Sequence, residues 1–545
     1  MPRTRLWSVV AVGCVLGAGC AGPEPSTGAR GDRPNILVIV ADDLGYADLG
    51  AYGGDIRTPS IDALAAEGVL LTQFHASPLC ATTRAMLLTG NNNHVAGLGR
   101  QGSLPGPVIP GLAGYENHLS DRTALLPRLL RESGYRTYMA GKWHLGEVVE
   151  HSPWAAGFDR SFAMKFGAGN HFDGTGMREE DRPKYFEDDA EVDWPEGAYS
   201  TTLYTDTLIG YLEDHAAGHA DSPFFMLAAY TSPHWPLQVP DEDLDLYAGR
   251  YDQGYDRLRE ERFASLQAAG IVPAGAELPP RNPAIVPFDS LDPAMRRRES
   301  RKMELYAAMV DNLDRHVGRL LETLRARGLY ENTLIVFMAD NGAAAEDFYD
   351  SGPYAEYLQA HYEDSTERMG RPGNWISYGP QWAEAGSAPF RLYKGFTTEG
   401  GMVAPMIVSG PGVGRPGSIS DAYVTVMDLM PTFLEIAGAG YPADKVPMRG
   451  ESARAWLAGE ADAVHDDRYV TMLMHRQRAF IRQGDWKLVS IEEPFDEAGF
   501  ALYDLAEDPG ETTDLSGSHA DVRDALIELW RTERRAVGII LPEDL

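Results

Sequence analysis

The chain has 545 residues and carries 48 Lys and Arg against 80 Asp and Glu, so its formal net charge is −32. The length and a hydrophobic content of 44% support a large core, and with the negative charge they exclude a short disulfide scaffold, a disordered tail and a basic nucleic-acid binder. An acidic chain repels polyphosphates and anionic membrane surfaces at long range, so nucleic acid is not an expected partner. An anionic substrate would need a locally basic pocket.

The N-terminal residues predict an export signal. Arg3 and Arg5 precede an apolar run, Leu6 to Leu16, that is too short to span a bilayer, and small residues then lead to Cys20. The residues LGAGC that end at Cys20 resemble a bacterial lipoprotein box, in which the cysteine is lipidated and becomes residue one. We expect residues 1–20 to be a signal peptide and residues 21–32, rich in Gly, Pro, Ser and Thr, to be a linker. The protein is then exported as a periplasmic or cell-surface lipoprotein, with plain secretion as the alternative.

Four short apolar runs are each followed at once by a polar cluster. Asn35–Ala41 leads to Asp42 and Asp43, Tyr135–Ala140 to Lys142 and His144, Phe224–Tyr230 to His234, and Leu334–Ala339 to Asp340 and Asn341. Near-continuous apolar strands are typical of a parallel sheet with both faces covered, and residues Tyr306–Leu324 repeat apolar positions at helical spacing. The sequence therefore predicts an α/β fold, a large mixed, mostly parallel sheet sandwiched by helices.

The pattern changes after about Gly440, which predicts two domains. We expect a catalytic domain over residues 33–440 and a smaller C-terminal α+β subdomain over residues 441–545. The second is indicated by short strands at Arg478–Ile481, Trp486–Ile491 and Ala501–Leu505 and by a terminal helix at Asp521–Ala536. Three segments with little periodicity, Asn170–Ser200, Asp241–Ser300 and Ala344–Ala388, are expected to form loops over the site.

The polar clusters at the strand ends predict a metal site. Ligands of open α/β sheets bind beyond the carboxyl ends of the strands, where these clusters lie. Asp42, Asp43, Asp340 and Asn341 offer hard oxygen ligands and lack the His or thiolate partners of a zinc site. Ca²⁺ or Mg²⁺ is the natural occupant of such a set.

Cys80 would be the one thiol left after processing at Cys20. A helical stretch that ends at Gly90 places Cys80 near a helix N-terminus, where backbone amides favour an anion, and Arg84 lies one turn along on the same face. Two interpretations stay open from these residues. Cys80 is a buried small hydrophobe, or it is a reactive group that Arg84 orients or polarises.

The residues from Cys80 to Gly90 resemble the sulfatase signature, Cys-x-Pro/Ala-x-Arg followed by a short helix and Thr-Gly, in which the cysteine is oxidised to Cα-formylglycine. The resemblance extends over nearly the whole mature chain. It includes PNILVIVADDLGYADLG at Pro34, TPSIDALAAEG at Thr58, GKWHLG at Gly141, SPHWPLQVP at Ser232, ADNGA at Ala339 and YGPQWAEAGSAPFRLYKGFTTEGG from Tyr378. HVAGLG at His94 and the last block look most like the bacterial arylsulfatase and alkylsulfatase branch of the alkaline phosphatase superfamily.

This resemblance implies an alkaline-phosphatase-like fold and the hydrolysis of a small aryl or alkyl sulfate. It implies one Ca²⁺ per chain held by Asp42, Asp43, Asp340 and Asn341, with the formylglycine from Cys80 completing the shell. It further implies that Arg84, Lys142 and His144 hold the formylglycine hydrate and sulfate oxygens, and that His234 and Lys394 bind sulfate and help the leaving group. A formylglycine-generating enzyme would act during maturation, and the mature protein is expected to be a monomer. His75, His94 and His118 are assigned structural roles.

Two positions depart from the family pattern, and three other functions compete. Thr82 stands where the signature has Pro or Ala, which bears on recognition by the converting enzyme, and Val403 stands where the family has Arg. The nearest rival is a phosphonate or phosphodiester hydrolase of the same superfamily. Another is a non-catalytic surface lipoprotein in which Cys80 stays a thiol. A papain-like cysteine hydrolase is disfavoured because Cys80 lacks that family's local signature.

Overall fold

A computed structural model describes residues 33–99, 111–350, 352, 354–363, 365–541 and 544. The predicted signal peptide and linker lie outside these residues. Within the described part of the chain, no helix is long and apolar enough to cross a membrane.

The predicted α/β class is confirmed by a ten-stranded mixed sheet with the order β11-β2-β10-β9-β1-β8-β4-β5-β6-β7. The five strands from β9 to β5 in this order are parallel, and β10, β6 and β7 add antiparallel pairs at the two sides. The strands are β1 Asn35–Ala41, β2 Val69–Leu71, β4 Arg136–Lys142, β5 Arg160–Met164, β6 Tyr185–Glu187, β7 Ala190–Val192, β8 Phe224–Ala229, β9 Thr333–Ala339, β10 Met406–Ser409 and β11 Ser418–Ser420. A separate pair joins β3 Phe74–His75 to β12 Val424–Thr425.

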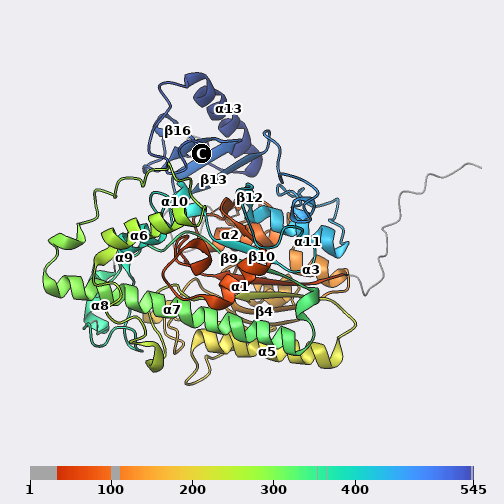
Figure 1. Ribbon diagram of the computed structural model, residues 1–545. Helices are drawn as coiled ribbons and strands as arrows, with labels where there is room; N and C mark the ends of the chain where they lie inside the picture. The colour runs from red at the N-terminus through yellow and green to blue at the C-terminus, as the bar shows by residue number, and fades with distance from the viewer. Residues whose placement is uncertain are drawn as a thin grey trace, which may run out of the picture.

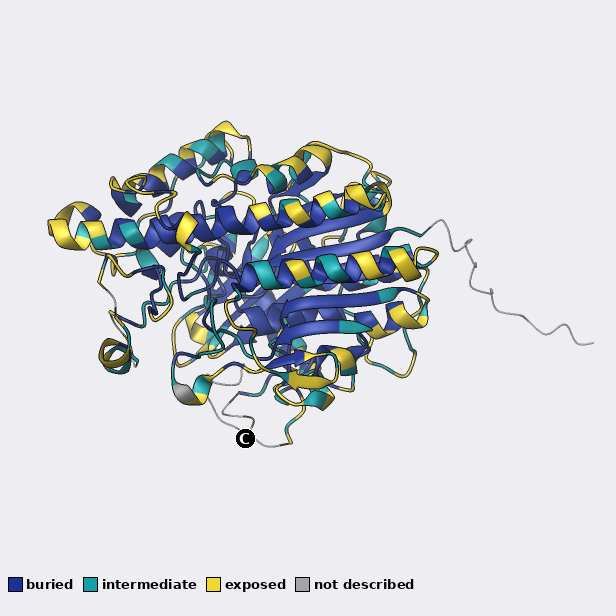
Figure 2. Ribbon diagram, turned by 90° about the horizontal axis from the view of Figure 1, so that it is seen from below, coloured by how far each residue is buried: buried dark blue, intermediate teal, exposed yellow. Residues whose placement is uncertain are grey.

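Helices cover both faces of this sheet (Figure 1). The long helices α5 and α7 lie side by side across one face, as Figure 2 shows, and α2, α3 and α11 pack together on the other. The centre of the sheet is buried on both faces. Every residue of β1 and β9 is buried, which explains their continuous apolar sequences. The helices of this domain are α1 Pro59–Glu67, α2 Cys80–Thr89, α3 Leu126–Glu132, α4 Pro153–Ala156, α5 Ser200–Gly218, α6 Gly254–Ala268, α7 Pro293–Ala326, α8 Ala355–His361, α9 Gly379–Gly386, α10 Glu399–Met402, α11 Leu429–Ala437 and α12 Arg454–Leu457.

The C-terminal part forms the predicted α+β unit, seen at the top of Figure 1. Its four-stranded antiparallel sheet has the order β13-β14-β15-β16, and α13 packs against three of these strands. A second hydrophobic cluster, centred on Trp530 of α13, fills the space between them. The elements are β13 Val470–His475, β14 Arg478–Gln483, β15 Trp486–Ser490, β16 Ala501–Asp504 and α13 Ala520–Val537.

The three segments expected to be loops contain regular elements, and that expectation was wrong. The short hairpin β6–β7 lies in Asn170–Ser200, α6 and the start of α7 lie in Asp241–Ser300, and α8 and α9 lie in Ala344–Ala388. Helix α6 escaped prediction because its buried face includes Arg262, which is 2% exposed. The Arg262 guanidinium lies 2.6 Å from Asp48 and 2.9 Å from Asp55, so ion pairs occupy a face that a periodicity argument expects to be apolar.

A buried ion cluster joins the C-terminal sheet to the first residue of α10. Lys487 of β15 lies 2.5 Å from Glu399 and 2.9 Å from Glu511, and Glu399 also pairs with His75 at 2.8 Å. Burial alone would raise the pKa of Glu399, but Lys487 and His75 hold it below its usual range. The cluster fixes Glu399, which follows Lys394 by five residues, against the C-terminal sheet.

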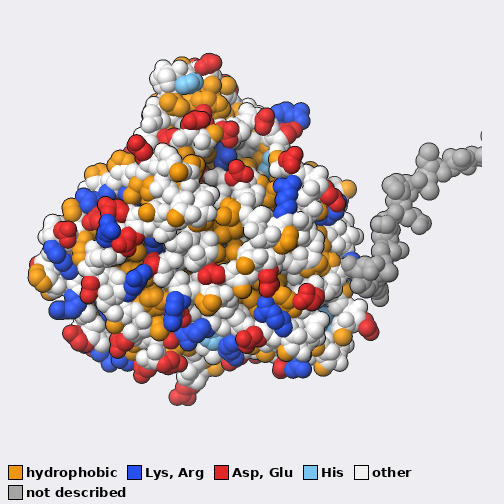
Figure 3. All heavy atoms as spheres, viewed as in Figure 1, with side chains coloured by type: hydrophobic (Ala, Val, Ile, Leu, Met, Phe, Trp, Pro, Cys, Tyr) orange, Lys and Arg blue, Asp and Glu red, His pale blue; other side chains and the backbone are white. Residues whose placement is uncertain are grey.

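Acidic and basic side chains are interspersed on the face seen in Figure 3. This face therefore shows no extended surface of a single sign.

Candidate active site

Four adjacent strands of the central sheet deliver the predicted polar residues to one edge. The strands β9, β1, β8 and β4 are neighbours and parallel, so their carboxyl ends meet. The residues that follow them are Asp340 and Asn341 after β9, Asp42 and Asp43 after β1, His234 after β8, and Lys142 and His144 at and after the end of β4. Cys80 reaches this edge from the start of α2, and Lys394 from the segment between α9 and α10.

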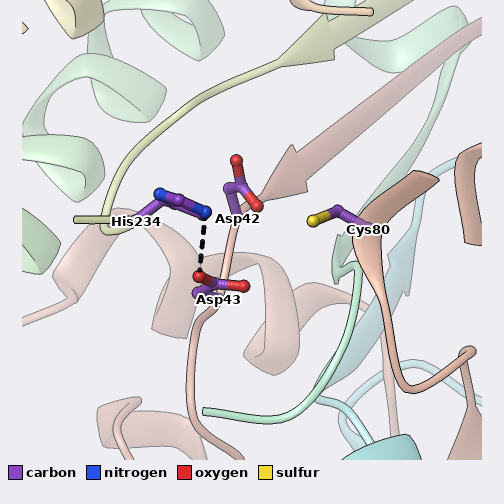
Figure 4. A group of neighbouring side chains, drawn as sticks. All are labelled: Asp42, Asp43, Cys80 and His234. Carbon is purple, nitrogen blue, oxygen red and sulfur yellow. Dashed lines mark ion pairs between the residues drawn. The ribbon is translucent and has the colours of Figure 1, made fainter. Parts of the chain in front are cut away.

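The centre of the site is a buried group made of Asp42, Asp43, Cys80 and His234. One ligand atom from each lies within 4.8 Å of the others, an arrangement that could hold a metal ion. In Figure 4 the His234 ring points at Asp43, with 3.3 Å between Nε2 and Oδ2, and the Cys80 thiol faces Asp42 from the opposite side. His234 belongs to this group, although the sequence did not predict it as a metal ligand.

Asp340 and Asn341 connect to this group through Asp43. The backbone N–H of Asp43 donates to Asp340 Oδ1 at 3.3 Å, and the Asn341 amide donates to Asp43 Oδ1 at 2.7 Å. Two buried oxygens, Asp42 Oδ1 and Asn341 Oδ1, have no hydrogen-bond partner among the described residues. Burial and the nearby Asp340 raise the pKa of Asp42 to about 8. Unpartnered hard oxygens within a cluster of carboxylates fit a hard divalent cation.

Three basic side chains lie against the three carboxylates. Lys142 Nζ is 2.6 Å from Asp42, Arg84 Nη2 is 2.8 Å from Asp340, and Lys394 Nζ is 2.7 Å from Asp43. Burial alone would lower the pKa of Lys142 and of Lys394, but the paired carboxylates raise both above the ordinary value. Both lysines are therefore ammonium ions, and the site holds the local positive charge that an anionic substrate needs.

The two histidines of the site are buried and differ in their partners. Burial, together with the neighbouring lysines, lowers the pKa of both His144 and His234 well below the ordinary value. His234 Nδ1 lies 2.7 Å from the carbonyl oxygen of Trp235, which can only accept, so Nδ1 carries the proton and Nε2 is the exchanging nitrogen. His144 has a left-handed backbone with φ of 62°, and its buried Nδ1 has no partner among the described residues.

Cys80 is the first residue of α2, as predicted, and Gly90 ends this helix in a left-handed conformation with φ of 63°. The Cys80 side chain is buried, and burial raises the pKa of its thiol to about 11. An unmodified Cys80 is therefore a neutral thiol at neutral pH, and a poor nucleophile. Thr82, the departure from the signature, is fully buried, and its hydroxyl donates to the Leu79 carbonyl at 2.7 Å.

The structure also places the other residues that were singled out in the sequence. Val403, the second departure, forms a β-bridge with His75, and His75 pairs with Glu399, in line with a structural role. His94 is buried, and the His118 ring stacks on His151 at 3.6 Å.

Sequence reasoning missed two residues that adjoin the site. Glu346 Oε1 lies 3.8 Å from Lys394 Nζ, and its Oε2 is buried without a partner among the described residues. A Cβ added at Gly167 would lie 2.4 Å from the His144 ring, so this glycine makes room for the imidazole. Neither carries a signal in the sequence, because both lie in segments without periodicity.

Comparison with known proteins agrees with this arrangement. Residues 34–439 match the model of the family described as Sulfatase, and residues 390–534 match one described as N-sulphoglucosamine sulphohydrolase, C-terminal. The chain is 38% identical to an uncharacterized sulfatase of Schizosaccharomyces pombe, over 95% of this chain and 96% of that protein. It is also 38% identical to an arylsulfatase of Klebsiella aerogenes, over 75% of this chain and 88% of that protein.

A similar solved structure is that of Ps i-CgsB in complex with k-i-k-neocarrahexaose. It superposes with a TM-score of 0.64 at 26% identity and covers 92% of both chains. A family match over most of the chain, together with relatives at 38% identity, shows the membership. The chain therefore belongs to the sulfatase family of the alkaline phosphatase superfamily and is a sulfuric ester hydrolase.

Proposed function

We propose that this protein hydrolyses sulfate esters to an alcohol or phenol and inorganic sulfate, with a nucleophile made by oxidising Cys80 to Cα-formylglycine and with one bound Ca²⁺. The observation that carries the proposal is the buried Cys80 thiol, which faces Asp42 and Asp43 at the start of α2. Its pKa of about 11 makes an unmodified thiol unsuited to attack. A modified Cys80 accounts both for its position and for the basic residues around it.

The calcium ligands would be Asp42, Asp43, Asp340 and Asn341, with the modified Cys80 completing the shell. The unpartnered oxygens of Asp42 and Asn341 support this assignment. When bound, the ion supplies positive charge against the sulfate oxygens, on which charge builds in the transition state. The formylglycine hydrate supplies one hydroxyl for attack on sulfur and a second from which the aldehyde reforms as sulfate leaves.

The chain's own residues bind and orient the sulfate group. Arg84 donates from Nη1 to the Lys142 carbonyl at 2.8 Å, which holds these two cations next to each other beside Cys80. With a sulfate ester in place, Lys142 and Lys394 can turn from the carboxylates to the ester oxygens and neutralise them. His144, neutral and with Nδ1 unpartnered, is placed to hydrogen bond with the hydrate.

We also propose that the protein is exported through residues 1–20, with lipidation at Cys20 as the form of membrane attachment. The linker over residues 21–32 would then separate the anchor from the catalytic domain. A formylglycine-generating enzyme would have to act before folding is complete, because Cys80 is 2% exposed in the folded chain. The folded protein is proposed to act as a monomer.

The proposal is tested by comparing kcat/KM of the protein from its native host on p-nitrophenyl sulfate and on an aryl phosphodiester. We expect the sulfate ester to be the faster substrate. A faster phosphodiester would instead favour the related phosphonate or phosphodiester hydrolase function. Absence of both activities in protein with a formylglycine at position 80 would contradict the proposal as a whole.

His234 is expected to act as the acid for poor leaving groups. Without substrate His234 is neutral with its proton on Nδ1, so Nε2 must first take up a proton, which the negative charge of a bound sulfate ester favours. Positioned acids of this kind contribute about 10²–10⁴-fold. His234→Ala should therefore slow an alkyl sulfate by about 10²-fold or more. It should slow p-nitrophenyl sulfate much less, because p-nitrophenolate leaves without a proton.

The measurement is kcat/KM for both substrates in both proteins. His118→Ala serves as the control and should leave both rates unchanged, because among the described residues the His118 ring contacts His151 and the Leu119 carbonyl and no site residue. Equal losses for the two substrates in His234→Ala would mean that His234 binds the common sulfate group. Lys394 or water would then be the better candidate for the acid.

A further inference from the structure

Three aromatic side chains form a series of ring contacts that begins at His234. The Trp235 ring centroid lies 4.4 Å from that of His234 and 5.1 Å from that of Phe348, whose ring meets Trp235 edge to face at 85°. The Phe348 ring in turn meets Tyr354 edge to face at 5.7 Å. We call Trp235, Phe348 and Tyr354 the aromatic wall.

The wall adjoins both residues that are proposed to help the leaving group. The Trp235 backbone carbonyl accepts from His234 Nδ1 at 2.7 Å, a bond that an alanine at this position would keep, and the Trp235 ring lies against the imidazole at 4.4 Å. Phe348 follows Glu346 by two residues, and Glu346 lies 3.8 Å from Lys394. His234 and Lys394 both contact Asp43, so the wall starts where the ester oxygen would depart.

In the part of the wall that is nearest to His234, formed by Trp235 and Phe348, the accessible side-chain surface is apolar carbon. Trp235 and Phe348 are both half-buried, whereas Trp375 behind them is 2% exposed. The one polar side-chain atom of Trp235, Nε1, is buried, so the exposed part of its ring is carbon. Phe348 has no polar side-chain atom. Rings that are already packed edge to face lose little conformational freedom on binding a ligand.

We propose that the aromatic wall binds the leaving group and that it selects an apolar alcohol, a phenol or an alkyl chain of several carbons, over a sugar. This rests on the sulfate ester hydrolysis proposed above. The exposed ring carbon of Trp235 and Phe348 releases water when an apolar group covers it, and it offers a sugar hydroxyl no hydrogen-bond partner. Trp235 and Phe348 are thereby the residues that determine specificity.

The test is a series of n-alkyl sulfates of increasing chain length. Their alcohols have nearly the same basicity, so the demand for a proton from His234 stays constant while the apolar area grows. In the native protein kcat/KM should rise with each methylene, by up to about fourfold where the added group is fully buried. The rise should appear mainly in KM, because contacts to the chain are the same in the ground and transition states.

Trp235→Ala and Phe348→Ala should each flatten this dependence while leaving the shortest alkyl sulfates nearly unaffected. The two residues lie on different segments, so a folding defect in one variant leaves the other to decide. Trp154→Ala is the matched control, because Trp154 is 45% exposed on α4 and contributes nothing to the wall. It should keep the native slope.

Four outcomes would count against the inference. A flat series in the native protein, or variants that keep its slope, would overturn it while leaving sulfate ester hydrolysis intact. A sulfated monosaccharide hydrolysed faster than a long alkyl sulfate would also overturn the selection proposed for the wall. If no sulfate ester were hydrolysed at all, the proposed function would fail, and this inference would fail with it.

Discussion

Cys80→Ser is expected to release at most one equivalent of phenol from an aryl sulfate and then to stop. A serine hydroxyl at this position can attack sulfur, but it has no second hydroxyl from which an aldehyde could reform to expel sulfate. Cys80→Ala has no nucleophile and should show neither the burst nor turnover. Both variants remove a buried thiol without adding bulk, so the fold should tolerate them.

The measurement is a phenol-release time course at high enzyme concentration, with intact-peptide mass spectrometry across Cys80. We expect the native peptide to be lighter than the thiol form and to react with a hydrazide, as an aldehyde does. Thr82 makes this the sharpest test of maturation, because it stands in the Pro or Ala position of the signature. Active protein that contains only the thiol form would refute the formylglycine mechanism.

Asp340→Asn is expected to lose the metal and, with it, at least about a hundredfold in kcat/KM, since a bound cation supplies several kcal/mol of transition-state stabilisation. Asp340 lies next to Asp43, whose backbone N–H donates to it, and it also pairs with Arg84 at 2.8 Å. The substitution keeps the size of the side chain and removes one negative charge from the proposed calcium site. Fewer charged oxygens hold a hard cation less tightly.

Metal content of the purified protein and the shift of Tm with added Ca²⁺ are the measurements. The native protein should contain about one Ca²⁺ and gain Tm with added ion, because a ligand that binds the folded state stabilises it. Asp314→Asn is the control. Asp314 is a buried aspartate that accepts backbone bonds from Ser60 and Ile61, away from the site. An Asp340→Asn variant with full calcium and normal turnover would contradict the assignment.

Local pattern was enough to place most of the site residues. The run Asn35–Ala41 became β1 with the same bounds, because a strand buried on both faces needs continuous apolar residues. The residues directly after such strands must lie at the carboxyl edge of a parallel sheet, so Asp42, Asp340 and His234 were brought close together as expected. Cys80 was predicted near a helix N-terminus and is the first residue of α2, and Gly90 ends this helix as predicted.

Contacts between segments that are distant in the sequence placed the residues that the local pattern could not. The contact of Lys394 with Asp43 joins residues 351 positions apart, and in the sequence alone the family resemblance gave the reason to connect them. Helix α6 was missed because the buried Arg262 finds its partners on a distant segment, at Asp48 and Asp55.

The amino-acid sequence by itself determined the four strands β1, β4, β8 and β9 of the central sheet, the position of Cys80 near a helix start, and the oxygen-rich clusters, because each depends on neighbours in the chain. The tertiary structure alone decided which buried charges are paired, that Asp42 and Asn341 keep unpartnered oxygens, and that Trp235 and Phe348 form a wall beside His234. The physical reason is that burial and charge pairing depend on which distant segments meet. The periodic pattern of a short stretch of sequence does not specify which distant segments come into contact.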